Sequence, residues 1–246
     1  MSLLDETVEI PRRTMTLFFM IDTSGSMAGS KIGAVNDAVV NVLPMLEEIS
    51  AENPDAEIKV AALEFSTTCH WLYNEPKPAN EFVWQDVQAS ALTSLGAACK
   101  ELSGKLSRSG FMKSASGSFA PAIILLSDGA PTDDFESGLA VLKNNNWFKA
   151  AIKVAVAIGE DADKEVLAQF TGTNEAVFTV HNIEALKQVI RIVAVTSSQI
   201  GSKSSTAGDT TKQEQVIAEV KSAVDNIGGA EVASVPSSTV SYDDWD

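Results

Sequence analysis

The stretch Met20-Ile-Asp22-Thr-Ser24-Gly-Ser26-Met27 carries one carboxylate and two hydroxyls at alternate positions. It overlaps the end of Met15–Ile21, a run that is apolar on both faces and therefore predicts a buried strand of a parallel sheet. A helical pattern starts soon afterwards, so Asp22, Ser24 and Ser26 are expected in the loop at the carboxyl end of this strand. In parallel α/β sheets, ligands bind at that end of the strands.

Four other apolar runs predict further strands of the same sheet: Ile58–Phe65, Ile123–Leu126, Ile152–Ile158 and Val177–Val180. Thr67–Tyr73 follows the first of them after almost no connection, so these two segments are expected to pair antiparallel at one edge. Helical patterns alternate with the runs, which favours an α/β architecture. The predicted fold is three-layered and doubly wound, with a mostly parallel sheet and one antiparallel edge strand.

Apolar residues at three- and four-residue spacing predict helices that begin near Ile32, Leu95 and Ile183. Pro44 falls inside the first of these helices and is expected to kink or end it, because proline has no backbone N–H to donate. A fourth amphipathic pattern opens with Thr211-Lys-Gln-Glu214, a capping-box sequence. This last helix is expected to lie outside the main domain.

The composition separates one domain from a C-terminal addition. The chain between Thr196 and Thr211 is rich in Ser and Thr and has almost no large side chain after Ile200, as in a linker. The predicted segments are an N-terminal extension (1–13), the α/β domain (14–197), a Ser/Thr-rich linker (198–211), an amphipathic helix (212–228) and a flexible acidic tail (229–246).

The 246 residues include 18 Lys and Arg against 33 Asp and Glu, a formal net charge of −15. This charge repels polyanions, so neither nucleic acid nor a membrane is expected as a partner. The N-terminus has no signal-peptide pattern, and no apolar run approaches the roughly 18 residues of a membrane span. We therefore expect a cytoplasmic protein in which Cys69 and Cys99 are free thiols.

A second strand end supplies another carboxylate, Asp128, just after Ile123–Leu126. If it lies near Asp22, the two carboxylates are costly together unless a cation lies between them. Thr93 precedes another helix and offers a further hydroxyl. Such hard oxygen donors suit Mg²⁺, Mn²⁺ or Ca²⁺ rather than zinc. The candidate metal ligands are Asp22, Ser24, Ser26, Thr93 and Asp128.

The order and spacing of these three segments resemble a von Willebrand factor type A domain over about residues 14–196. That family carries a metal-ion-dependent adhesion site (MIDAS) made of such segments. Within it, the segments that most resemble the bacterial TerY-like branch are Asp22-Thr-Ser-Gly-Ser-Met27, Thr93-Ser-Leu-Gly and Asp128-Gly-Ala-Pro-Thr-Asp-Asp134. That branch is associated with tellurium resistance and with Ser/Thr kinases and phosphatases. The resemblance implies a Rossmann-like fold and a non-enzymatic, Mg²⁺-dependent module that binds an Asp or Glu of a partner protein, possible partners being such a kinase or phosphatase.

The resemblance also implies roles for the five residues. Ser24, Ser26 and Thr93 would coordinate the metal directly, whereas Asp22 and Asp128 would act largely through bound waters. Mostly neutral donors leave the metal electrophilic, with an open position for a partner's carboxylate. The acidic C-terminal tail is a second candidate for that position, because tethering gives it a high effective concentration. Exchange of the Thr93 or Asp128 contacts would link ligand binding to helix movement.

Other interpretations compete with this one. Taken alone, the Asp22 loop is compatible with a turn and a helix cap. Asp22 after a strand also resembles the nucleophile of haloacid-dehalogenase-like phosphatases, but that family has a second Asp where this chain has Ser24. A metal-assisted phosphohydrolase that uses the same cation is the alternative function. Asp133 and Asp134 are expected to begin a helix rather than to bind metal.

Overall fold

The central strand β1 carries the Asp22 loop and is buried along nearly its whole length. The computed structural model describes residues 12–90, 92–114, 116–203 and 210–233, and in this part of the chain eight strands form one sheet in the order β3-β2-β1-β5-β6-β7-β8, with β4 paired to β2. The strands are β1 (Arg13–Asp22), β2 (Ala56–Phe65), β3 (Cys69–Trp71), β4 (Lys77–Pro78), β5 (Ala122–Ser127), β6 (Ile152–Ile158), β7 (Val177–Val180) and β8 (Ala230–Val232).

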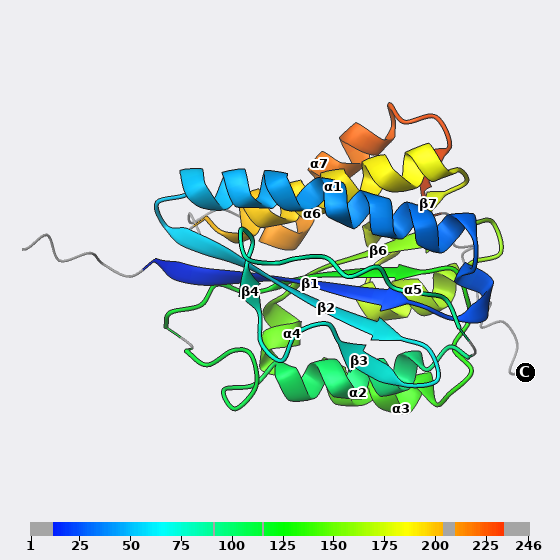
Figure 1. Ribbon diagram of the computed structural model, residues 1–246, viewed down its shortest axis with the longest axis horizontal. Coiled ribbons are helices and arrows are strands. Elements are labelled where there is room, and N and C mark those ends of the chain that lie inside the picture. Colours follow the sequence, from blue (N-terminus) through cyan, green and yellow to red (C-terminus); the bar gives the residue numbers. More distant parts are fainter. Residues whose placement is uncertain (1–11, 91, 115, 204–209, 234–246) are drawn as a thin grey trace, which may run out of the picture.

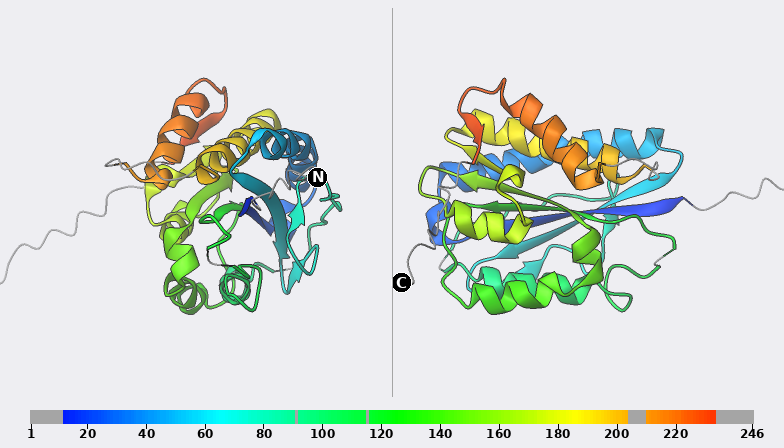
Figure 2. Two further views of the ribbon diagram at one scale, coloured as in Figure 1. Left: turned by 90° about the vertical axis from the view of Figure 1, so that its left-hand side faces the viewer. Right: turned by 180° about the vertical axis from the view of Figure 1, so that it is seen from behind.

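Helices cover both faces of the sheet, which makes the predicted three layers (Figures 1 and 2). They are α1 (Ser30–Glu52), α2 (Leu95–Lys105), α3 (Phe135–Lys143), α4 (Asn146–Ala150), α5 (Lys164–Thr171), α6 (Ile183–Gly201) and α7 (Lys212–Val224), with short 3₁₀ turns at Gly25–Met27 and Asn174–Ala176. Successive side chains of β1 point to opposite faces of the sheet, so each face packs against its own layer of helices. Leu17 and Phe19 pack among α1, α6 and α7, whereas Phe18 and Met20 pack among α2 to α5.

The sheet is mostly parallel, as predicted, but it has more antiparallel strands than the single edge strand expected. β3 pairs antiparallel with β2 within the predicted segment Thr67–Tyr73, and β4 pairs with β2 in the same sense. At the other edge, β8 pairs antiparallel with β7. The sequence analysis missed β8 because three residues are too short to show a strand periodicity.

The C-terminal boundaries predicted from sequence need correction. α6 continues through the expected domain end at 197 to Gly201, and β8 lies inside the segment 229–246 that was expected to be flexible. α7 is not separate from the domain, because Val216, Val220 and Val224 are fully buried in the core beside α6. The predictions for residues 1–11, 204–209 and 234–246, including self-ligation by the acidic tail, lie outside the described residues.

Pro44 does not end α1, which continues to Glu52. The side chains of Val40 and Pro44 are both exposed, so the carbonyl that loses its helical partner lies on the solvent face. Within the described residues, no helix is long and apolar enough to cross a membrane.

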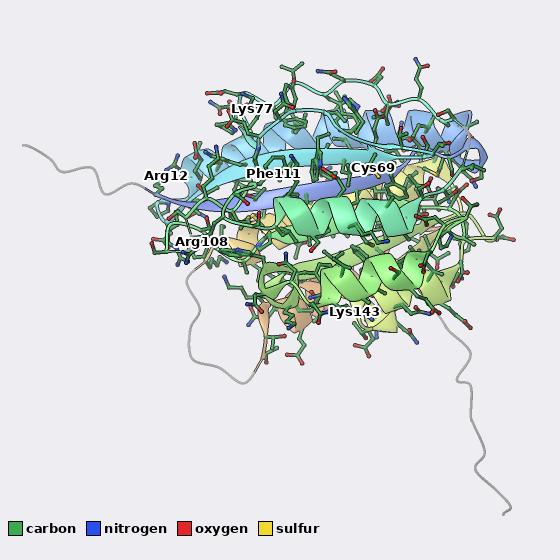
Figure 3. All side chains as sticks on the ribbon, turned by 90° about the horizontal axis from the view of Figure 1, so that it is seen from below. Arg12, Cys69, Lys77, Arg108, Phe111 and Lys143 are labelled. Atoms are coloured by element: carbon green, nitrogen blue, oxygen red, sulfur yellow. The ribbon has the colours of Figure 1, made fainter. Side chains whose placement is uncertain are left out.

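Cys69 and Cys99 are free thiols, as predicted. Cys99 is on the buried face of α2, and Cys69 is half-buried. Burial raises the pKa of the Cys69 thiol to about 11. Figure 3 shows Cys69 and Phe111 on the face that α2 covers. Trp71 packs edge-on against Phe111 with 4.9 Å between ring centroids.

We predict that Gly138→Ala destabilises the protein, because the added Cβ would lie 2.1 Å from the carbonyl oxygen of Gly96 where α3 crosses α2. Such overpacking costs about 1–3 kcal/mol, measured as a lower urea midpoint. Gly104→Ala is the matched control, because it adds the same methyl group to a neighbouring helix with nothing within 4 Å. Equal midpoints for the two variants would contradict the close contact.

Candidate metal centre

Asp22 ends β1 between β2 and β5, the two strands that flank it. Its carboxylate is fully buried and oriented by two hydrogen bonds: the Ser24 N–H donates to Oδ1 at 2.8 Å, and the Ser127 hydroxyl donates to Oδ2 at 2.6 Å. Burial raises the pKa of Asp22, and the nearby Asp128 raises it further. An uncompensated charge at this position is therefore unfavourable, and a cation would relieve it.

Ser24 and Ser26 connect the β1 loop with the end of β5. The hydroxyl oxygens of the two serines lie 3.1 Å apart, and Ser26 Oγ donates to Asp128 Oδ1 at 2.7 Å. Parallel pairing of β1 with β5 explains the encounter, because Ile21 lies opposite Leu126 and both chains leave the sheet at the same edge. The predicted proximity of Asp22 and Asp128 follows from this register.

Thr93 reaches the same cluster from the loop before α2. A Cβ added to Gly129 would lie 3.6 Å from Ser26 Oγ and 4.0 Å from Thr93 Oγ1, which places both hydroxyls around the Asp128 loop. Thr132 braces the two loops: its backbone N–H and its hydroxyl donate to the Thr93 carbonyl at 2.8 and 3.1 Å. The Thr93 N–H donates in turn to Thr132 Oγ1 at 3.2 Å.

Asp133 and Asp134 both bind helix N-termini, but not of the same helix. Asp134 caps α3 by accepting from the Ser137 N–H, as expected for a helix start. Asp133 instead accepts from the Gly96 and Ala97 N–H groups of α2, at 2.9 and 2.8 Å. The sequence alone did not indicate this second cap, because it depends on α2 and α3 lying side by side.

Lys31 is a residue of the site that the sequence analysis missed. Its ammonium group forms an ion pair with Asp128 Oδ2 and lies 3.9 Å from Asp161 Oδ1. The Asp128 side chain is fully buried, so Lys31 supplies the cation that this carboxylate needs. One signal was available: Lys31 lies in the first turn of α1, where the helix dipole disfavours a positive charge unless an acid is near.

The structure therefore brings all five predicted residues to one edge of the sheet, where hydroxyl and carboxylate oxygens are the donors. In the described residues, no group of three or more His, Cys, Asp or Glu side chains is placed to hold a metal. The donor set is thus hydroxyl-rich, with two carboxylates, and suits a hard divalent ion. The ammonium at Asp128 shows that the cluster accepts a positive charge.

We predict that Lys31→Met tightens Mn²⁺ binding about tenfold, a change of about 1.4 kcal/mol, because the competing ammonium is removed. The metal-free variant should also melt at a lower temperature than the wild type, since Asp128 loses its counter-ion. Calorimetry with Mn²⁺ and thermal unfolding in EDTA measure the two effects. Lys31→Arg keeps the positive charge and should stay close to the wild type. Unchanged or weaker Mn²⁺ binding by Lys31→Met would contradict the competition.

Comparison with known proteins identifies the family and the fold. Residues 16–192 match the family profile described as the von Willebrand factor type A domain. No curated protein matches the chain. Among solved structures, a von Willebrand factor type A protein from Catenulispora acidiphila matches at 16% identity with a TM-score of 0.56, over 76% of this chain and 43% of that one.

Two further structures share the fold. The ArnB paralog VWA2 from Sulfolobus acidocaldarius matches at 20% identity with a TM-score of 0.51, over 72% of this chain and 44% of that one. Proximal thread matrix protein 1 from the mussel byssus, described with a zinc-occupied MIDAS motif, matches at 14% identity with a TM-score of 0.58, over 76% and 48%. The chain thus spans less than half the length of each of these three proteins.

Proposed function

Because this chain belongs to the von Willebrand factor type A family, we propose that it is a metal-dependent protein-binding module rather than an enzyme. One observation carries the proposal: three loops from separate parts of the chain place two buried carboxylates and three hydroxyls around one point. The structure of a family relative with a metal in its MIDAS motif supports metal-dependent binding in general.

The proposed ligands are Asp22, Ser24, Ser26, Thr93 and Asp128, and the proposed ion is Mg²⁺, with Mn²⁺ or Ca²⁺ as substitutes. When bound, such an ion supplies an electrophilic centre that accepts a further oxygen ligand. The Ser24, Ser26 and Thr93 hydroxyls are the direct donors in this proposal. Asp22 already accepts two hydrogen bonds, which orient its carboxylate for a supporting role through water. Lys31 would release Asp128 when the divalent ion enters.

The proposed ligand is an Asp or Glu side chain of a partner protein. A carboxylate supplies both the negative charge and the hard oxygen that such an ion accepts. The net charge of −15 repels an acidic partner at long range, so the attraction has to come from the metal at short range. The metal-free protein is therefore expected to bind such a partner very poorly.

The biological setting is proposed from the sequence motifs alone. The resemblance of the Thr93 and Asp128 segments to the TerY-like branch suggests a bacterial stress response such as tellurium resistance, in the cytoplasm. A Ser/Thr kinase or phosphatase is then the proposed partner. No named relative among the comparisons supports this narrower assignment.

We predict that Asp128→Asn abolishes detectable Mg²⁺ and Mn²⁺ binding in calorimetry, because it removes a buried charge from the donor set. Asp161→Asn is the matched control: it makes the same substitution near Lys31, at an exposed carboxylate, and should leave metal affinity within about twofold. Equal affinities of the two variants would refute the site.

Partner binding is predicted to require the bound metal. A partner captured from cell extract in Mg²⁺ should be released by EDTA, should be lost with Asp128→Asn, and should be retained with Asp161→Asn. Replacing the partner's contacting Asp or Glu by Asn or Gln should abolish capture. Capture that persists in EDTA would argue against a metal-dependent module.

The alternative, a metal-assisted phosphohydrolase, makes a different prediction. We expect no turnover of p-nitrophenyl phosphate by the Mn²⁺-loaded protein. The proposed role of the mostly neutral donors is to hold a metal, and we assign none of them as a nucleophile. Asp22→Ala tests the alternative directly. Turnover that is present in the wild type and lost in this variant would favour the phosphohydrolase.

A further inference from the structure

A cavity of about 800 Å³ lies at the end of the sheet opposite the metal centre. It opens at the amino ends of β1 and β6 and at the first turn of α7, whereas Asp22 and Asp128 follow the carboxyl ends of β1 and β5. In Figure 1, β1 runs from left to right, so its amino end is on the left and its carboxyl end on the right. The two sites therefore lie at opposite ends of β1.

Four basic side chains from different elements converge on the cavity, in a chain whose net charge is −15. They are Arg13 of β1, Lys149 of α4, Lys153 of β6 and Lys212 of α7. None of them forms an ion pair with a carboxylate among the residues that the structure describes. Their positive charge is thus concentrated rather than neutralised.

Backbone carbonyls hold two of these ammonium groups in place. Lys153 Nζ donates to the carbonyls of Phe148 and Ala151 at 3.1 and 2.8 Å. Lys212 Nζ donates to the carbonyls of Gly201 and Lys203, at the end of α6. An ammonium group has three N–H donors, so each lysine keeps one for a ligand. Carbonyl dipoles orient the groups but leave their net charge uncompensated.

Phe119 is buried beneath these charges, with only 4% of its surface exposed. The Arg13 guanidinium lies 3.9 Å from the centre of its ring, and Lys212 Nζ lies 5.1 Å from the same point. Ile217 adds a second apolar side chain to the lining. The cavity therefore presents donors for an anion, backed by buried apolar side chains.

Two carboxylates also line the cavity, so four positive charges face two negative ones. Glu214 accepts hydrogen bonds from the backbone N–H and hydroxyl of Thr211, at 2.7 and 2.9 Å, in the capping box of α7. Glu175 is exposed and forms no ion pair with the described residues. Burial lowers the pKa of Lys153, and burial together with the charge of Arg13 lowers that of Lys212. A bound anion would relieve both effects.

We propose that this cavity binds a small molecule carrying a phosphate or pyrophosphate group, with Arg13, Lys149, Lys153 and Lys212 as the anion ligands. A small oxyanion contacts only the local cluster of cations, whereas a large polyanion also meets the acidic remainder of the chain. This excludes nucleic acid but not a phosphorylated metabolite. Free pyrophosphate and phosphorylated organic molecules share this chemistry.

The test is calorimetry of the full chain with inorganic pyrophosphate in EDTA, so that the metal centre holds no ion that could bind the anion. Saturable binding is expected in the wild type. Lys149→Met and Lys212→Met should each weaken it at least fivefold. Lys149 is exposed, so its variant is expected to fold even if Lys212→Met does not. Lys221→Met, an exposed lysine of α7 outside the cavity, is the matched control and should bind as the wild type does.

A second titration compares pyrophosphate with a nucleoside diphosphate at equal ionic strength. Tighter binding of the nucleotide than of pyrophosphate identifies an organic phosphate as the ligand, and equal or weaker binding identifies the free anion. Absence of saturable binding of both, or equal weakening by Lys149→Met and Lys221→Met, would overturn the proposal. Because EDTA is present throughout, these results are independent of the metal-dependent function.

Discussion

The burial of Asp22 and Asp128 at one edge of the sheet is the constraint on which the rest of this structure depends. Parallel pairing of β1 with β5 brings the two carboxylates together, where they are buried away from bulk water. Their negative charges are tolerated because Ser26, Ser127 and Lys31 donate to them. Two buried carboxylates held in this way are stabilised by a cation that binds beside them. This electrostatic requirement links the fold to the proposed metal-dependent function.

The loops around these carboxylates are joined to one another. Thr132 ties the Thr93 loop to the segment after β5, and Asp133 on the same segment caps α2. Close packing of Gly96 against Gly138 holds α2 and α3 together behind the two loops. The Thr93 hydroxyl is thus placed by the same segment that carries Asp128. Preorganised donors of this kind need little rearrangement when a ligand binds.

The net charge of −15 conceals an uneven distribution. Asp22 and Asp128 lie at the proposed cation site at the carboxyl ends of the strands, whereas Arg13, Lys153 and Lys212 gather around a cavity at the amino ends. The overall charge governs the long-range repulsion of a polyanion, whereas the charges of each site act on a ligand a few ångströms away. One end of the domain is therefore suited to a cation and the other to a small anion.

The sequence by itself determined the α/β class, the central strand and the five candidate ligands, because apolar runs and the Asp22-x-Ser24-x-Ser26 spacing are local features. Their role in metal binding stays a prediction. Only the tertiary structure decided the ion pair of Lys31, the cap that Asp133 places on α2, and the strand β8 beside β7. Each of these depends on a partner far away in the chain or on a neighbouring element. Such contacts leave no periodic signal in the sequence, because packing of whole helices and strands sets them.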